Sequence, residues 1–132
     1  MEKGSIIGII VTHGNLAEEL LATVEMIVGK THDFYAMSGS DLCDENVAQR
    51  IGDLVTDSGR ERRAVVFVDY FGGSCSAATI RATREYSDVR VISGVNLPIL
   101  LDFVNKQDTY GLEEIVDHLL HRGRESIRVV TF

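Results

Sequence analysis

Three short apolar runs constrain the fold of this chain more than any other feature. They cover residues 5–12, 64–68 and 89–92 and consist mainly of isoleucine and valine. Their apolar residues follow one another with little polar interruption, which is typical of strands that helices cover on both faces. Because strands buried on both faces belong to parallel sheets, we predict an α/β fold with these runs at its centre.

Segments with helical periodicity separate the runs. Leucine and valine recur at helical spacing over 16–28, where Asn15 and Glu18 have the spacing of a capping box and Gly29 is expected to end the helix. Two further strands are predicted, an edge strand at 33–37 and a last strand at 126–132. A second helix is predicted around 47–55, which opens at Asp41 or Asp44 and closes near Gly59. Three more helices are predicted at 74–86, at 99–105 after Pro98, and at 112–122 with Gly123 as the stop.

The order of these elements predicts the topology. We expect one domain over residues 1–132. Strands that alternate with helices are joined by right-handed crossovers, so we predict a doubly wound, mainly parallel sheet with the strand order 2-1-3-4. The winding then reverses between the first and the third strand. Such sheets bind ligands at this reversal, beyond the carboxyl ends of the strands.

Charge and hydropathy exclude several classes of protein. The net charge of −7 argues against a nucleic-acid partner, and we interpret Arg60, Arg62 and Arg63 as the solvated exit of a helix. The apolar runs are far shorter than the roughly 20 residues of a membrane span. The N-terminus lacks the basic and then apolar layout of a signal peptide, so we expect a cytoplasmic protein.

Two polar residues follow the strands between which the winding reverses. His13 follows the first strand, and Asp69 follows the third. A glycine-rich loop, Gly72-Gly73-Ser74, comes shortly after Asp69. We therefore expect both side chains and the backbone amides of this loop to share one crevice.

These groups suit the transfer of a phosphoryl group. A neutral imidazole offers a basic nitrogen for in-line attack near neutral pH, and Asp69 can hold the other ring nitrogen as N–H. The amides of Gly73 and Ser74, the Ser74 hydroxyl and the N-terminus of the next helix can hold phosphoryl oxygens without a metal. Gly72 allows a close backbone approach. No cofactor is predicted.

Other polar side chains carry weaker signals. His118 and His121 lie at positions i and i+3 of the last predicted helix. Because no carboxylate set is evident beside them, we interpret them as surface histidines rather than metal ligands. Asp102 and Asn105 are expected to face water, and His32 lies in a predicted turn.

Five segments also occur in the order and at the spacing of a known family. They are Gly8-Ile-Ile-Val-Thr-His13-Gly14, Leu16-Ala-Glu-Glu-Leu-Leu21, Glu25-Met26, Val68-Asp69-Tyr-Phe-Gly-Gly-Ser74 and Ser93-Gly-Val-Asn-Leu-Pro-Ile-Leu100. Through these segments the chain resembles the mannose-type IIA phosphocarrier domain of the phosphoenolpyruvate-dependent sugar phosphotransferase system (PTS). The resemblance covers essentially the whole chain.

The resemblance implies a phosphotransferase in which His13 is the phosphorylated histidine and Asp69 is its hydrogen-bond partner. The phosphoryl-binding residues are then expected to be Thr12, Gly72, Gly73 and Ser74. The expected partners are the phosphocarrier HPr, which donates the phosphoryl group, and a IIB component, which receives it, with membrane IIC and IID components involved only indirectly. The resemblance also implies a homodimer that exchanges an antiparallel C-terminal strand.

The chain departs from the family pattern in two places near the site. Cys75 stands where proline is usual, and Tyr70-Phe71 stand in place of Thr-Trp. Neither change removes a reacting group, but both bear on the docking surface. The chain also ends where family members often continue through a linker into a IIB domain, so a free-standing IIA protein is expected.

Alternative functions remain open at this point. One is a regulatory module whose phosphorylation state is read by a transcription factor or a kinase. Another is the phosphocarrier domain of a dihydroxyacetone kinase system, which shares the fold and an active histidine. A receiver domain phosphorylated on aspartate would need an acidic cluster for Mg²⁺ after the first strand, where this chain has Thr12 and His13.

Overall fold

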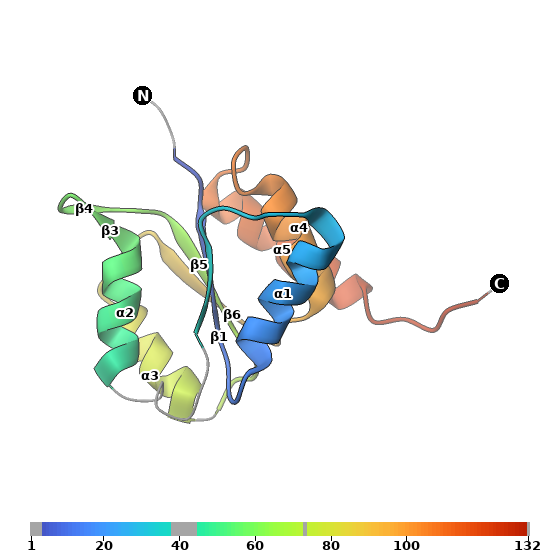
Figure 1. The fold of residues 1–132 in the computed structure, drawn as a ribbon, viewed down its shortest axis with the longest axis horizontal. Helices are drawn as coiled ribbons and strands as arrows, with labels where there is room; N and C mark the ends of the chain where they lie inside the picture. The colour runs from blue at the N-terminus through green and yellow to red at the C-terminus, as the bar shows by residue number, and fades with distance from the viewer. Residues whose placement is uncertain (1–3, 38–44, 73, 132) are drawn as a thin grey trace.

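A four-stranded sheet forms the centre of the molecule (Figure 1). The computed structural model describes residues 4–37, 45–72 and 74–131, apart from the side chains of Glu45, Ser74 and Cys75. The strands are β1 (Ile7–Val11), β2 (Phe34–Met37), β5 (Ala64–Val68) and β6 (Val89–Ser93). They lie in the order β2-β1-β5-β6, and every pairing is parallel. The predicted α/β class and strand order are confirmed.

Helices cover both faces of the sheet, as Figure 1 shows. The helices on one face are α1 (Leu16–Val28), α4 (Leu97–Lys106) and α5 (Leu112–Glu125), and those on the other are α2 (Glu45–Val55) and α3 (Ser74–Thr83). Within the described ranges, no helix is long and apolar enough to cross a membrane.

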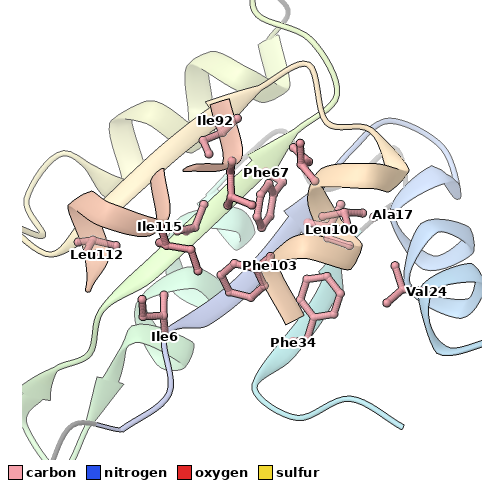
Figure 2. Close-up of a cluster of buried hydrophobic side chains, with 14 residues drawn as sticks. Ile6, Ala17, Val24, Phe34, Phe67, Ile92, Leu100, Phe103, Leu112 and Ile115 are labelled. Carbon is pink, nitrogen blue, oxygen red and sulfur yellow. The ribbon is translucent and has the colours of Figure 1, made fainter. Parts of the chain in front are cut away.

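The two faces of the sheet bury two separate cores. Ile6 and Ile10 point to the α1/α4/α5 face, whereas Ile9 points to the α2/α3 face. On the first face the ring of Phe103 lies against those of Phe34 and Phe67, with ring centroids 5.7 and 5.4 Å apart (Figure 2). This two-sided burial is the reason that the strand sequences are continuously apolar.

Gly8, in the middle of β1, allows two of these rings to approach the sheet. A Cβ atom at this position would lie 2.5 Å from Cε2 of Phe103 and 2.6 Å from Cδ1 of Phe34. Because the rings would have to move, Gly8→Ala is expected to lower the free energy of unfolding by about 1–3 kcal/mol. Urea denaturation measures this loss.

Gly4→Ala is the matched control for Gly8→Ala, because the nearest atom to a new Cβ there is 3.9 Å away. Its unfolding midpoint should stay close to that of the wild type. Equal midpoints for both variants would contradict the close packing at Gly8.

The predicted capping box at the start of α1 is wrong. Asn15 makes no side-chain capping bond. Instead, Oγ1 of the fully buried Thr12 accepts a hydrogen bond of 2.7 Å from the backbone N–H of Ala17. A threonine at the end of β1 therefore satisfies a free amide of the first helical turn.

The predicted closure of the second helix near Gly59 is also wrong. α2 ends at Val55 and is followed by a hairpin of β3 (Thr56–Asp57) and β4 (Arg60–Glu61). Ser58 and Gly59 have φ angles of 54° and 79°. These left-handed values are those that a two-residue type I′ turn requires. Asp41 and Asp44, the predicted starts of this helix, lie outside the described residues.

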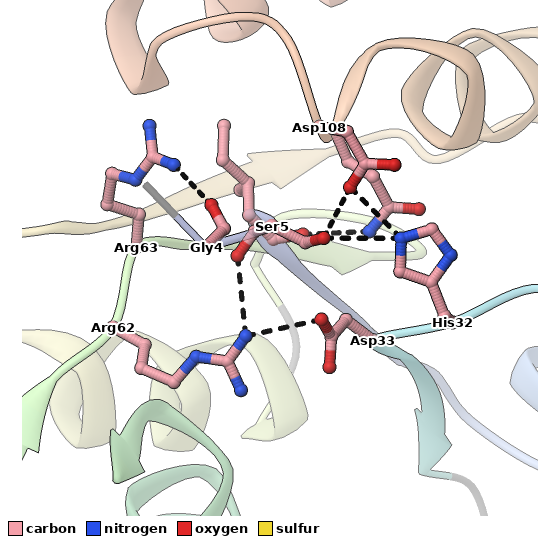
Figure 3. Close-up of polar contacts among 9 residues, drawn as sticks. Gly4, Ser5, His32, Asp33, Arg62, Arg63 and Asp108 are labelled. Carbon is pink, nitrogen blue, oxygen red and sulfur yellow. Dashed lines mark hydrogen bonds and ion pairs between the residues drawn. The ribbon is translucent and has the colours of Figure 1, made fainter. Parts of the chain in front are cut away.

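A polar cluster at the amino ends of the strands holds the N-terminal segment (Figure 3). Nη2 of Arg62 lies 3.2 Å from Oδ2 of Asp33 and donates to the carbonyl oxygen of Ser5. His32 pairs with Asp108 at 3.0 Å. Arg62 therefore belongs to this cluster, and its interpretation as part of a solvated helix exit is wrong.

The C-terminal helix does not stop at Gly123 as predicted, because α5 continues to Glu125. A Cβ atom at Gly123 would lie 2.7 Å from Cγ2 of Ile99, so the glycine allows α4 and α5 to approach closely. Residues 127–131 form no strand in this single chain and extend away from the body (Figure 1). Ile127, Val129 and Val130 are 71–86% exposed there.

Asp102 is buried between α4 and α5, so the prediction that it faces water is wrong. Its carboxylate lies 2.8 Å from Nζ of Lys106, 2.6 Å from Nε2 of His118 and 3.2 Å from Nε of Arg122. Burial raises the pKa of Asp102, but the Lys106 hydrogen bond and the charges of Lys106 and His118 outweigh it and leave the pKa below the usual 3.8. His118 therefore has a carboxylate neighbour that the sequence did not reveal.

The lowered pKa of Asp102 predicts how its contribution to stability depends on pH. The folded protein binds the proton less tightly than the unfolded chain does, so this contribution is present above about pH 4 and is lost as the pH falls through the folded pKa. Asp102→Asn is expected to lower the free energy of unfolding at pH 7 by about 1–3 kcal/mol. The deficit should shrink as the pH falls below about 4, and urea denaturation at a series of pH values measures it. A deficit that is constant with pH would contradict the ionised pair.

Candidate functional site

The carboxyl ends of β1 and β5 bring His13 and Asp69 together. These strands are neighbours in register, with Val11 opposite Val68. Asp69 directly follows β5, and His13 follows β1 after one residue, Thr12. Nδ1 of His13 lies 2.9 Å from Oδ2 of Asp69. The backbone N–H of His13 donates to the same oxygen at 3.0 Å. His13 is therefore held by the Asp69 carboxylate through both its ring and its backbone.

Asp69 remains ionised at neutral pH in this arrangement. Its other oxygen, Oδ1, accepts a hydrogen bond of 3.0 Å from the backbone N–H of Tyr70. Burial raises the pKa of Asp69, but the hydrogen bonds from the backbone and ring of His13 and from Tyr70 outweigh it and lower the pKa below its ordinary value. Because the carboxylate is an acceptor only, the Nδ1 atom facing it carries a proton.

The second ring nitrogen of His13 remains open. No described residue forms a hydrogen bond to Nε2, and the side chain is 43% exposed. Tyr70 stacks against the imidazole, with ring centroids 5.3 Å apart and an interplanar angle of 22°. The arrangement thus offers one fixed nitrogen and one accessible nitrogen, with an aromatic ring against one face of the imidazole.

The glycine-rich loop follows Asp69 and leads into α3. Gly72 has a φ angle of 117°, a conformation that side chains with a Cβ rarely adopt. Its N–H donates a 3.0 Å hydrogen bond to Oγ of the buried Ser76. Ser74 begins α3, so the free amides of a helix N-terminus lie at the end of this loop. Gly73 and the Ser74 side chain lie outside the described part of the structure.

Thr12, one of the predicted phosphoryl-binding residues, lies in the interior of the protein. Its side chain is fully buried, and its hydroxyl accepts the hydrogen bond from Ala17 described above. In this conformation the hydroxyl orients the first turn of α1 rather than facing the crevice.

Sequence reasoning missed the local roles of Tyr70 and Ser76. Tyr70 directly follows Asp69 in the sequence. This position is a usable signal for a contact with the site, because the aromatic ring must lie close to the Asp69 carboxylate. Ser76 follows Gly72 at helical spacing, which is the pattern of a side chain that bonds a nearby backbone amide. In the ranges that the structure covers, no three His, Cys, Asp or Glu side chains gather as metal ligands.

The geometry suits nucleophilic chemistry at Nε2. A carboxylate that orients Nδ1–H keeps the lone pair on Nε2 and stabilises positive charge when that nitrogen forms a bond. The loop and the N-terminus of α3 supply backbone amides on the same side of the sheet, where an anionic group would be stabilised. The site thus places an imidazole with an oriented ring on the same side of the sheet as the start of α3.

Comparisons with known proteins find relatives that match most of this chain. A family model described as EIIA-man, PTS system fructose IIA component, matches residues 8–120. The mannose-specific EIIAB component of Escherichia coli strain K12 is 30% identical over 128 residues, which cover 92% of this chain but 38% of that protein. This chain therefore spans well under half the length of that relative.

Two further relatives match over most of their length. The fructose-specific EIIA component of Bacillus subtilis is 26% identical over 126 residues, covering 92% of this chain and 84% of that protein. The crystal structure of the PTS component EIIA from Streptococcus agalactiae superposes with a TM-score of 0.83 at 25% identity, covering 94% of this chain and 96% of that one.

Proposed function

The chain belongs to the EIIA-man family of PTS IIA components, and on that premise we propose that it is a phosphocarrier whose His13 accepts a phosphoryl group from HPr and passes it to a IIB component. One observation carries the assignment of His13. Its Nδ1 is held by Asp69 at 2.9 Å, while no described group bonds to its Nε2. An imidazole in that state is ready to attack phosphorus without first losing a proton.

The proposed reaction exchanges one phosphorus–nitrogen bond for another. The lone pair of Nε2 attacks the phosphorus of phosphohistidine on HPr, and the bond from phosphorus to the HPr imidazole breaks, returning its electron pair to that ring. The His13 ring gains positive charge, which the ionised Asp69 offsets through Nδ1–H. Transfer to the IIB component repeats the exchange with His13 as the donor. In both steps the phosphoryl group moves and the ring proton on Nδ1 stays.

The loop that leads into α3 is proposed to hold the phosphoryl oxygens. The amides of Gly73 and Ser74 and the Ser74 hydroxyl are the donors, supported by the positive end of the α3 dipole. Gly72, whose own N–H bonds to Ser76, allows the close backbone approach. Thr12 contributes indirectly, because its buried hydroxyl fixes the turn that carries His13. No metal ion has a part in this scheme.

Mass spectrometry of the intact protein tests the proposal. After incubation with phosphoenolpyruvate, enzyme I and HPr, the chain should gain the mass of one phosphoryl group. The modification should be acid-labile and alkali-stable, as a phosphoramidate is, and peptide mapping should place it on His13. A phosphoryl group on an aspartate or serine would contradict the proposal.

Asp69→Asn is expected to give a folded protein that transfers phosphate about 10²–10³-fold more slowly. An amide can present either a donor or an acceptor to Nδ1 and so loses both the fixed tautomer and the compensating charge. The loss should be smaller than the roughly 10⁴-fold seen when a serine protease loses its orienting aspartate, because here histidine is itself the nucleophile. Single-turnover rates by rapid quench with phospho-HPr measure the effect.

Asp108→Asn is the matched control for Asp69→Asn. It changes a more exposed aspartate, which pairs with His32 at the opposite end of the sheet. Transfer by this variant should match the wild type. Equal rates for wild type and Asp69→Asn would reduce Asp69 to a structural residue.

The exposed C-terminal tail supports a proposed homodimer. β6 forms one edge of the described sheet. Apolar side chains at 127, 129 and 130 are exposed in the single chain, and an unpaired edge beside an unpaired apolar segment invites strand pairing. We infer that each tail adds an antiparallel strand to the sheet of a second subunit.

A further inference from the structure

A groove runs along the opposite edge of the sheet, beside β2. Its volume is about 590 Å³. In Figure 1, β2 is the teal strand that passes between α2 and α1. The groove is lined by all four residues of β2, by one side of α1 and by one side of α2. Neither His13 nor Asp69 is among its lining residues.

The floor of this groove is an edge strand with free backbone groups. The carbonyl of Asp33 accepts a hydrogen bond from Gly8 in β1, and that of Met37 accepts one from Thr12, the residue after β1. Because backbone groups in a parallel strand face its two neighbours alternately, Phe34 and Ala36 direct their N–H and C=O groups away from β1. No described residue bonds to those groups of Phe34 or Ala36. The edge can therefore accept another strand.

The helices α1 and α2 line the groove with both apolar and charged side chains. Leu21 and Ala22 of α1 and Leu54 of α2 provide apolar side chains next to the strand. Three carboxylates, those of Glu18, Glu25 and Asp53, stand among the lining residues, against one guanidinium, that of Arg50.

The net negative charge of the lining indicates the charge of the occupant. A basic ligand would gain Coulomb energy from the excess carboxylates, and the chain's overall charge of −7 would favour its approach. An acidic ligand would be repelled on both counts.

We propose that the β2 groove binds an extended basic segment of a partner protein, which adds a strand to the sheet next to Phe34 and Ala36. Backbone hydrogen bonds to the free edge provide affinity, and alternate side chains of the segment enter the space beside α1 and α2. Lysine or arginine in the segment meets Glu18, Glu25 and Asp53. This surface is independent of the proposed phosphoryl transfer, because its residues do not contact His13 or Asp69.

Two synthetic peptides test the chemistry of the occupant. One alternates valine with lysine, and the other alternates valine with glutamate. In ¹H–¹⁵N spectra of the full chain, the lysine peptide should shift the amide signals of Phe34 and Ala36 and slow their hydrogen exchange. The glutamate peptide should do neither. Equal effects of the two peptides, or no protection of these amides, would overturn the proposal. Binding of small molecules in the groove without binding of the lysine peptide would overturn it as well.

A matched pair of charge reversals tests the position of the groove. Glu18 and Glu19 are neighbours in the first turn of α1, but only Glu18 lines the groove. Glu18→Lys is expected to weaken binding of the lysine peptide by about threefold to tenfold, because an attraction becomes a repulsion. Glu19→Lys should leave its Kd within about twofold of the wild type. Equal weakening by both reversals would show general charge attraction and would overturn the proposal.

Ala36→Pro tests the added strand itself. The N–H of Ala36 faces away from β1, so proline removes a donor from the free edge and leaves the β1 pairing in place. The lysine peptide should lose most of its binding. His13→Ala should bind the peptide like the wild type, so failure of the phosphocarrier proposal and failure of this one are distinguishable. Undiminished binding by a folded Ala36→Pro chain would exclude strand addition.

Discussion

His13→Ala is expected to take up no phosphoryl group from phospho-HPr. The variant lacks the only atom proposed to bond to phosphorus, and a methyl group provides no substitute nucleophile. The fold should survive, because the side chain is 43% exposed and lies beyond the end of β1. Intact mass after incubation with phosphoenolpyruvate, enzyme I and HPr measures the loss.

The other three histidines of the chain supply the controls for this experiment. His32→Ala, His118→Ala and His121→Ala should each be phosphorylated to the same extent as the wild type. Circular dichroism should show the same secondary structure in all four variants. Full labelling of His13→Ala, traced to one of the other histidines, would overturn the assignment.

Deletion of residues 127–132 is expected to convert a dimer into monomers or insoluble protein. The deletion leaves α5 complete, since that helix ends at Glu125. It removes three exposed apolar side chains whose burial in a partner would each contribute about 1.5 kcal/mol or more. The Kd of the dimer should therefore rise by about 10³-fold or more. Sedimentation velocity over a range of concentrations measures it.

Single substitutions in the tail separate strand exchange from other contacts. Neighbouring residues of a strand face opposite sides. Val129→Asp should weaken the dimer, because a carboxylate would enter the apolar contact, whereas Arg128→Asp should weaken it much less. A soluble dimer that survives the deletion would show that the tail does not hold the subunits together.

The central sheet was predictable because its signal is local and strong. The two central strands, β1 and β5, are short runs of residues buried throughout. The helices between the strands make right-handed crossovers, which restricts the topology. The hairpin at Ser58 and Gly59 was not predicted, because a glycine after an amphipathic helix resembles a helix stop. The burial of Asp102 depends on how closely α5 approaches α4, and no periodicity in either helix encodes that distance.

The candidate site was predictable to the level of its two facing side chains. The rule that ligands bind where the winding reverses placed His13 and Asp69 in one crevice. The rule does not specify side-chain conformations, so the stack of Tyr70 and the bond from Gly72 to Ser76 emerged only with the loop geometry. Thr12 shows a limit of the family resemblance, which implied a phosphoryl-binding role for a residue whose side chain is buried.

The stack of Tyr70 on His13 gives the protein a built-in optical probe. The chain contains four tyrosines and no tryptophan, so its near-ultraviolet absorption and emission are not masked by an indole. One of these four phenol rings lies 5.3 Å from the imidazole whose charge is proposed to change in each cycle. A stopped-flow instrument can therefore observe the state of that histidine in the unlabelled protein, through the spectrum of its neighbour.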